Sequence, residues 1–237
     1  MSQLVKYRGH SKASLQLDPR AHSLAALVEG FAGEWSAWEL ANVSCAELAL
    51  GLGSPAFFTE VEAAFERHRG EVPNVAKGDM STQELLMVTR AFIQAGFFDV
   101  AFFDAVAAAV AGTAHHFSAR GLSEMSWALG RAFQTFSVES ANAAHALKPD
   151  AVPKSHRDAL GGHVHANPLR SAAFAAMAGR CRRLSGEMRC MDVSNTLYGF
   201  ACAGVHDREL LELLAARTAR IAAQMSENLQ ARDTDTR

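Results

Sequence analysis

The stretch FSARGLSEMSWALGRAF, residues 117–133, decides the fold of this chain of 237 residues. Its apolar residues recur at the spacing that places them on one side of an α-helix. They are Leu122, Met125, Ala128, Leu129 and Ala132. Because a single helix cannot cover its own apolar side, this stripe requires neighbouring helices to pack against it.

The same stripe returns three times elsewhere in the chain. We call the first residue of each stripe its anchor, and the four anchors are Leu40, Leu85, Leu122 and Val193. Successive anchors are 45, 37 and 71 residues apart, so the last interval is nearly two units long. This repetition predicts a chain built from similar helical units.

Each unit contains a signal for the end of its first helix and the start of a second. A glycine, which can end a helix in the left-handed conformation, follows three of the anchors by eleven residues. These glycines are Gly51, Gly96 and Gly204, whereas Phe133 stands at that place after Leu122. Six and seven residues after each glycine comes an apolar pair that predicts the second helix: Phe57-Phe58, Phe102-Phe103 and Leu210-Leu211.

We therefore predict an all-α fold, a right-handed α-solenoid of about four helix-turn-helix repeats with an inserted basic loop. The repeat domain spans residues 21–226, with units near 35–69, 80–112, 118–147 and 188–225 and an insertion at 148–169. For the third unit we expect a first helix over 119–134 and a second over 138–147. Residues 227–237 are expected to be a polar tail, and residues 1–20 a basic N-terminal tail or targeting remnant.

The repeat pattern resembles the degenerate helical repeats of organellar RNA-binding proteins, namely octotricopeptide-repeat proteins and the repeat regions of RAP-domain proteins. The segments that carry the resemblance are LSEMSWALGRAF, ELLMVTRAFIQAGFFDVAFFDAVA and VSNTLYGFACAG followed by HDRELLELLA. The resemblance covers roughly residues 35 to 226 and includes no RAP domain. It implies a helical-repeat fold and association with RNA in an organelle.

Several classes of protein receive no support from the sequence. Hydrophobic residues make up 49 per cent of the chain, but no run reaches the ~18 uninterrupted apolar residues of a membrane span. The four cysteines form no CxxC pair, and the sequence has no phosphate-binding glycine loop, GxSxG or HExxH motif. His163 and His165, with His156 and His145 nearby, have no cysteine or acidic cluster at ligand spacing. We therefore expect no enzyme, no cofactor and no metal site.

A basic segment is the first candidate site for RNA. The whole chain has a formal net charge of -2, but residues 145–189 contain eight Lys or Arg against three acidic residues. Clustered Lys and Arg bind phosphates, so these eight are the candidate phosphate contacts, although a solvated helix face with a loop explains them as well. They are Lys148, Lys154, Arg157, Arg170, Arg180, Arg182, Arg183 and Arg189.

A second candidate site comprises the residues two and five positions after each anchor. In helical-repeat RNA readers, equivalent side chains bond to base edges or stack on bases. The residues of suitable chemistry are Asn42, Arg90, Trp127, Asn195 and Tyr198, whereas Cys45 and Met87 do not fit. Trp127 is expected to pack between repeats rather than stack on a base.

Together these features predict a non-catalytic, RNA-associated protein of an organelle, a mitochondrion in preference to a plastid. The expected partners are organellar RNA, ribosomal RNA in particular, and neighbouring proteins of a ribosome or similar assembly, with no membrane or DNA. The alternative is a protein-binding scaffold or accessory subunit of another large organellar complex. The acidic remainder of the chain and the apolar Met87, Trp127 and Tyr198 favour that alternative.

Overall fold

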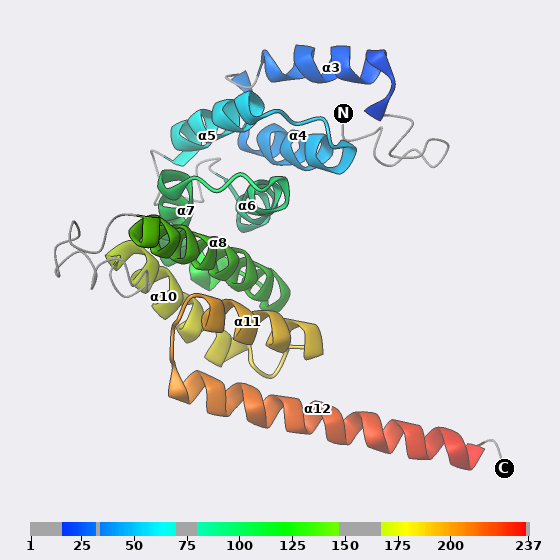
Figure 1. Ribbon diagram of the computed structural model, residues 1–237. Coiled ribbons are helices and arrows are strands. Elements are labelled where there is room, and N and C mark those ends of the chain that lie inside the picture. The colour runs from blue at the N-terminus through cyan, green and yellow to red at the C-terminus, as the bar shows by residue number, and fades with distance from the viewer. Residues whose placement is uncertain (1–15, 32–33, 70–79, 147–166, 236–237) are drawn as a thin grey trace. The chain divides into compact units, whose positions relative to one another are not determined.

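The computed structural model of the protein describes residues 16–31, 34–69, 80–146 and 167–235. Over these residues the chain forms nine α-helices and no strand (Figure 1). The chain divides between Gly112 and Thr113 into two compact units, which are described separately below. The all-helical structure confirms the predicted all-α class, and its packing is compatible with either a helical bundle or a solenoid.

The first unit contains five helices, and the second contains four helices and a short 3-10 turn. The first has α3 (Pro19–Glu29), α4 (Ala37–Leu50), α5 (Pro55–Arg69), α6 (Thr82–Ala95) and α7 (Val100–Thr113). The second has η3 (Ala114–His116), α8 (Ala119–Ala146), α10 (Pro168–Leu184), α11 (Cys190–Cys202) and α12 (Arg208–Asp235). No helix among the described residues is long and apolar enough to cross a membrane.

Helices α4, α6, α8 and α11, which we call the A helices, all begin three residues before an anchor and follow a capping residue four before it. In each, the anchor amide donates to the carbonyl oxygen of that capping residue, at 2.9 to 3.0 Å. Ser36 and Ser81 also form capping boxes with the glutamate three residues on, while the Ser118 hydroxyl accepts from the Gly121 amide. Such caps stabilise a helix by about 1 kcal/mol each. The four anchors thus occupy one common register.

The predicted left-handed glycines end three of these helices. Gly51, Gly96 and Gly204 have φ of 72°, 72° and 68°, and no other described residue has a positive φ. After each glycine, the next amide donates to a carbonyl five residues back, as in a Schellman motif. Three residues after the glycine, the side chain of Ser54, Asp99 or Asp207 accepts from the first turn of α5, α7 or α12. The predicted second helices are confirmed at these three places.

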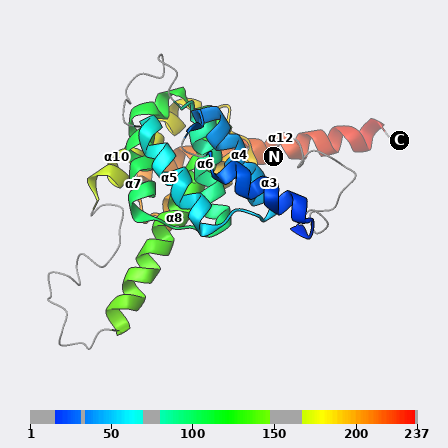
Figure 2. The same ribbon diagram turned by 90° about the horizontal axis from the view of Figure 1, so that it is seen from above.

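The third predicted unit differs from its prediction. The expected break between residues 134 and 138 does not exist, because α8 continues as one helix from Ala119 to Ala146 and its last turns project from its own unit (Figure 2). Phe133, where the other units have glycine, is helical and buried. Instead of a second helix within 138–147, α10 packs beside α8. The C-terminal residues also differ, since α12 continues to Asp235 through the expected polar tail.

Large apolar side chains form a separate core in each unit. In the first unit the rings of Phe92 and Phe102 stack with centroids 3.8 Å apart, and Phe58 contacts Phe92 edge to face. In the second unit Phe174 of α10 contacts both Phe133 of α8 and Phe200 of α11. The four anchors lie within these cores, none more than 4% exposed.

The A helices within each unit also pack on one another, α4 on α6 and α8 on α11. The α8–α11 contact is close enough to exclude side chains at its centre: a Cβ on Gly130 would overlap the Gly199 backbone, and one on Gly199 would overlap the Ser126 carbonyl. Glycine is therefore required at both positions for these two backbones to touch.

Candidate functional site

Three of the predicted phosphate contacts in α10 make contacts within the protein. Arg180 donates from Nε and Nη2 to the Phe117 carbonyl, both at 3.1 Å. Arg182 pairs with Asp207 at 2.5 Å and Glu209 at 3.0 Å, while the Arg170 guanidinium lies 4.6 Å from the Phe133 ring centroid. These three side chains link α10 to neighbouring segments of the protein, so a phosphate would have to compete with those contacts for the guanidinium groups.

The other five members of the basic segment divide into two groups. Arg183 and Arg189 are exposed and reach solvent. Lys148, Lys154 and Arg157 lie outside the described residues. The structure therefore places two described arginines of this set where a phosphate could reach them without breaking an internal ion pair.

The predicted base-contacting residues have mixed positions. Tyr198 is 42% exposed, whereas Asn42, Arg90, Trp127 and Asn195 are half-buried. The Asn42 amide group already donates to the Trp38 carbonyl at 2.8 Å. In the first unit the Cys45 thiol donates to the Met87 carbonyl at 3.4 Å, so these positions lie at the contact between α4 and α6.

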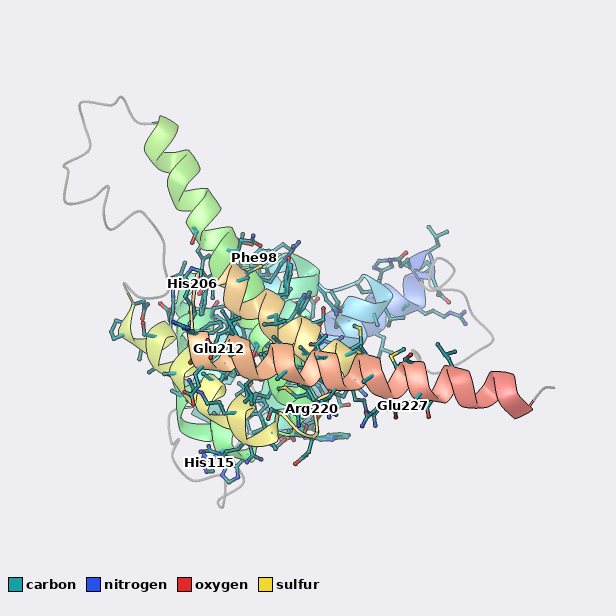
Figure 3. The ribbon with its side chains drawn as sticks, turned by 90° about the horizontal axis from the view of Figure 1, so that it is seen from below. Phe98, His115, His206, Glu212, Arg220 and Glu227 are labelled. Carbon is teal, nitrogen blue, oxygen red and sulfur yellow. The ribbon has the colours of Figure 1, made fainter. Side chains whose placement is uncertain are left out.

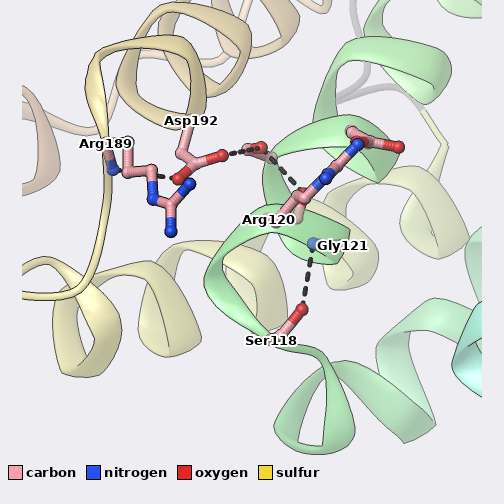
Figure 4. Close-up of polar contacts among 7 residues, drawn as sticks. Ser118, Arg120, Gly121, Arg189 and Asp192 are labelled. Atoms are coloured by element: carbon pink, nitrogen blue, oxygen red, sulfur yellow. Dashed lines mark hydrogen bonds and ion pairs between the residues drawn. The ribbon is translucent and has the colours of Figure 1, made fainter.

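An open groove of about 880 Å³ lies at the N-terminal ends of α8 and α11 and beside the middle of α12. Arg120, Arg189 and Arg217 line it together with Glu124, Glu187 and Asp192, so its charges balance. The Asp192 carboxylate accepts from the Arg189 amide at 2.9 Å and from the Ser123 hydroxyl at 3.3 Å (Figure 4). Arg120 is paired with Glu124 at 2.8 Å. The groove can accept a polar segment but does not concentrate positive charge.

Helix α8 receives α11 on one face, and α4 contacts α6 at the matching position of Cys45. This face contains the residues one, five and eight positions after the anchor. In α8 these are Ser123, Trp127 and Gly130, and α11 covers them through the Ser123–Asp192 hydrogen bond and the contact at Gly130. Ser123 is fully buried and Gly130 is buried as a result. We call this the receiving face of an A helix.

The receiving face of α11 is exposed. Ser194, Tyr198 and Ala201 hold the three positions and are all exposed, and Met191 beside them is 68% exposed. In α4 and α6, by contrast, the residue one position after the anchor is buried, Ala41 at 0% and Leu86 at 4% exposed. The sequence prediction identified only Tyr198 on this surface. The offset from the anchor could have revealed the others, because Ser194 and Ala201 match Ser123 and Gly130.

Other chemically active groups do not form a site. No group of three His, Cys, Asp or Glu among the described residues could hold a metal ion. The predicted histidine segment, with His156, His163 and His165, lies outside that part of the chain. Cys181 is fully buried, and burial raises the pKa of its thiol to about 12. The Cys181 thiol is therefore shielded from solvent, whereas the free thiol of Cys190 is exposed.

One buried carboxylate is unusual. Glu47 of α4 is 0% exposed, and neither carboxylate oxygen has a hydrogen-bond partner. Burial raises the pKa of Glu47 to about 7, and the negative charge of nearby Glu29 adds to the increase. Its position seven residues after the anchor is apolar in every other A helix, as Phe92, Leu129 and Phe200.

No known protein-family model matches the chain, and no curated protein matches it in sequence.

Proposed function

We propose that the protein is a non-catalytic α-solenoid that acts as a protein-binding scaffold within a large organellar assembly. The observation that supports this proposal is the exposed receiving face of α11, at Ser194, Tyr198 and Ala201. The same face of α8 is covered by a helix of this chain. Stacked repeats need a terminal unit with a polar outer face, and an aromatic and a methionine on that face favour a further partner.

The test compares the assembly formed by two charge-matched variants in cells that naturally produce the protein. The full-length chain with Ser194→Arg and Ala201→Arg should leave the large assembly and sediment as a free protein in a density gradient. The control carries Ala222→Arg and Ala223→Arg, which add the same charge at exposed positions of α12. If the α11 variant remains in the assembly like the control, the scaffold proposal is wrong.

Binding of organellar RNA, as in a mitochondrial ribosome, is the second candidate. It is favoured by the exposure of Arg183 and Arg189, the latter at the rim of the groove. Phosphate contacts predict an affinity that falls steeply with salt, because each contact releases a counterion. Changing both arginines to alanine should flatten that dependence, whereas changing exposed Arg131 and Arg220 should not. Equal slopes for the two double variants would exclude this RNA site.

A further inference from the structure

The contact between α8 and α11 defines what a receiving face binds. At one end the Ser123 hydroxyl, which also donates to the Arg120 carbonyl at 2.8 Å, lies 3.3 Å from an oxygen of the Asp192 carboxylate. Seven residues further along α11, Gly199 touches the backbone of α8. The incoming helix thus supplies a carboxylate in its first turn and a residue without a bulky side chain two turns later. Between these points, Thr196 is fully buried.

Helix α6, which packs on α4 in the first unit, contains the same two features, whereas α8 has Gly121 in place of the carboxylate. The carboxylate one residue before the anchor is Glu84 in α6, and the small residue six positions after the anchor is Ala91, which is 0% exposed. Helix α6 packs on α4, where Cys45 donates to the Met87 carbonyl. Each unit therefore contains a pair of A helices in which the second helix has an acidic first turn and a small, buried residue seven positions later.

The receiving face of α11 reproduces that of α8 in chemistry as well as position. The order in α8 is small, aromatic, small, as Ser123, Trp127 and Gly130, and in α11 it is Ser194, Tyr198 and Ala201. A serine hydroxyl is again available to a carboxylate, and an alanine again allows close backbone approach. The exposed surface therefore continues the helix pairing already present within the chain.

A second copy of this chain offers no free helix of the required kind among the described residues. The small residues at the crossing position are already buried within each molecule, with Ala46 at 3% and Ala91 and Ala128 at 0% exposed. Gly199 is occupied by α8. The described helices of a second copy are therefore already occupied, which favours a helix of another protein.

We infer that the receiving face of α11 binds an α-helix of a partner protein that has Asp or Glu in its first turn and Gly or Ala seven residues later. This inference rests on the scaffold function and specifies its partner. The helix lies across α11 as α11 lies across α8, with its carboxylate near Ser194 and its small residue near Ala201.

The chain itself supplies the probe for this inference. A fluorescein-labelled peptide of residues 188–204 has the required features at Asp192 and Gly199, with serine replacing both cysteines. Because an isolated helix of this length is marginal in water, a hydrocarbon staple links positions 194 and 198, away from the side that α11 turns to α8. Fluorescence anisotropy then measures its binding to the full-length protein.

We expect saturable binding to the wild-type protein and at least tenfold weaker binding to the Ala201→Leu variant. A peptide with Gly199→Leu should lose binding similarly, whereas the protein variant Ala222→Leu, on exposed α12, should bind like wild type. Circular dichroism of each protein variant confirms folding. Absence of wild-type binding, or equal binding by Ala201→Leu, overturns the inference.

Two further results separate this inference from the scaffold proposal. If the peptide fails to bind but the double-arginine α11 variant still leaves the assembly, the surface binds a partner of different structure and only the inferred helix is wrong. If that variant stays in the assembly, the scaffold proposal itself fails. A concentration-dependent dimer in sedimentation that Ala201→Leu abolishes would assign the face to a second copy and overturn the inference.

Discussion

Replacement of Glu47 by glutamine should stabilise the protein in a manner that depends on pH. The side chain is 0% exposed, both oxygens lack hydrogen-bond partners, and burial raises the pKa to about 7 from the usual 4.5. The charged groups that act on it from α3 are Glu29, which opposes ionisation, and His22, which favours it. Glutamine has nearly the same shape but cannot ionise.

The sign follows from the protons bound in each state. Between about pH 4.5 and 7 the folded protein holds a proton on Glu47 that the unfolded chain has released, so folding is favoured most at low pH. That stability is fully present below about pH 4.5, falls across this interval and is lost once the pH has risen through 7, where the folded carboxyl ionises without a partner. A difference of about 2.5 pH units corresponds to about 3 kcal/mol of unfolding free energy.

The assay is urea unfolding of the full-length protein, followed by circular dichroism at about pH 5 and about pH 8. Glu47→Gln should be more stable than wild type by about 3 kcal/mol at the higher pH and nearly equal to it at the lower. The control is Glu60→Gln, which removes an exposed carboxylate of α5. Glu47→Leu, which matches the apolar residues of the other A helices, should stabilise at both pH values.

The comparison of the two pH values tests the reasoning. If the difference between wild type and Glu47→Gln is the same at both, Glu47 does not titrate between them in the folded protein. Destabilisation by glutamine at the higher pH would mean that the carboxylate is held by a favourable interaction.

Gly130→Ala should lower the free energy of unfolding by about 3 kcal/mol, because the added methyl group forces α8 and α11 apart. Gly179→Ala, at an uncrowded position of α10, should raise it slightly. Thermal unfolding of both variants tests this, and equal melting temperatures would refute it. Arg182→Ala removes two ion pairs to the start of α12 and should lower the free energy of unfolding by about 1 kcal/mol. Hydrogen exchange of the backbone amides in the first turn of α12 should become faster, and unchanged exchange would show that the ion pairs do not stabilise that turn. Iodoacetamide should modify exposed Cys190 readily in the native protein but modify buried Cys181 only on unfolding, as peptide mass spectrometry would show; native labelling of both at similar rates contradicts the packing.

Local signals made the start and end of most A helices predictable. The glycines at 51, 96 and 204 adopt the left-handed conformation because only residues tolerant of positive φ fit there, and their spacing from the anchors is visible in the sequence. The prediction failed for α8, which continues past Phe133 as one helix. Phe133 removed the stop signal, and its burial against Phe174, which is 41 residues further along the chain, favours helix where a break was expected.

The candidate site was less predictable because its properties depend on long-range contacts. Arg180 and Arg182 have the composition of phosphate ligands, yet their partners Phe117 and Asp207 lie 63 and 25 residues away in sequence. The exposure of Tyr198 likewise depends on whether a further helix covers the receiving face of α11, and none of the described helices does. Residue type indicates what a side chain can bind, but only packing decides which side chains are free to bind.

The second half of α12 lies beyond α11 and displays Arg220 and Glu227 along its surface (Figure 3). This arrangement means that displacement increases along the helix toward its C-terminal end. Because α12 contacts its unit mainly through its first half, at Leu210, Leu214 and Arg217, a small rotation there produces a large displacement of Met225 and Leu229 near its free end. A fluorophore placed near Leu229 would therefore report movements of the core that are too small to detect at the core itself.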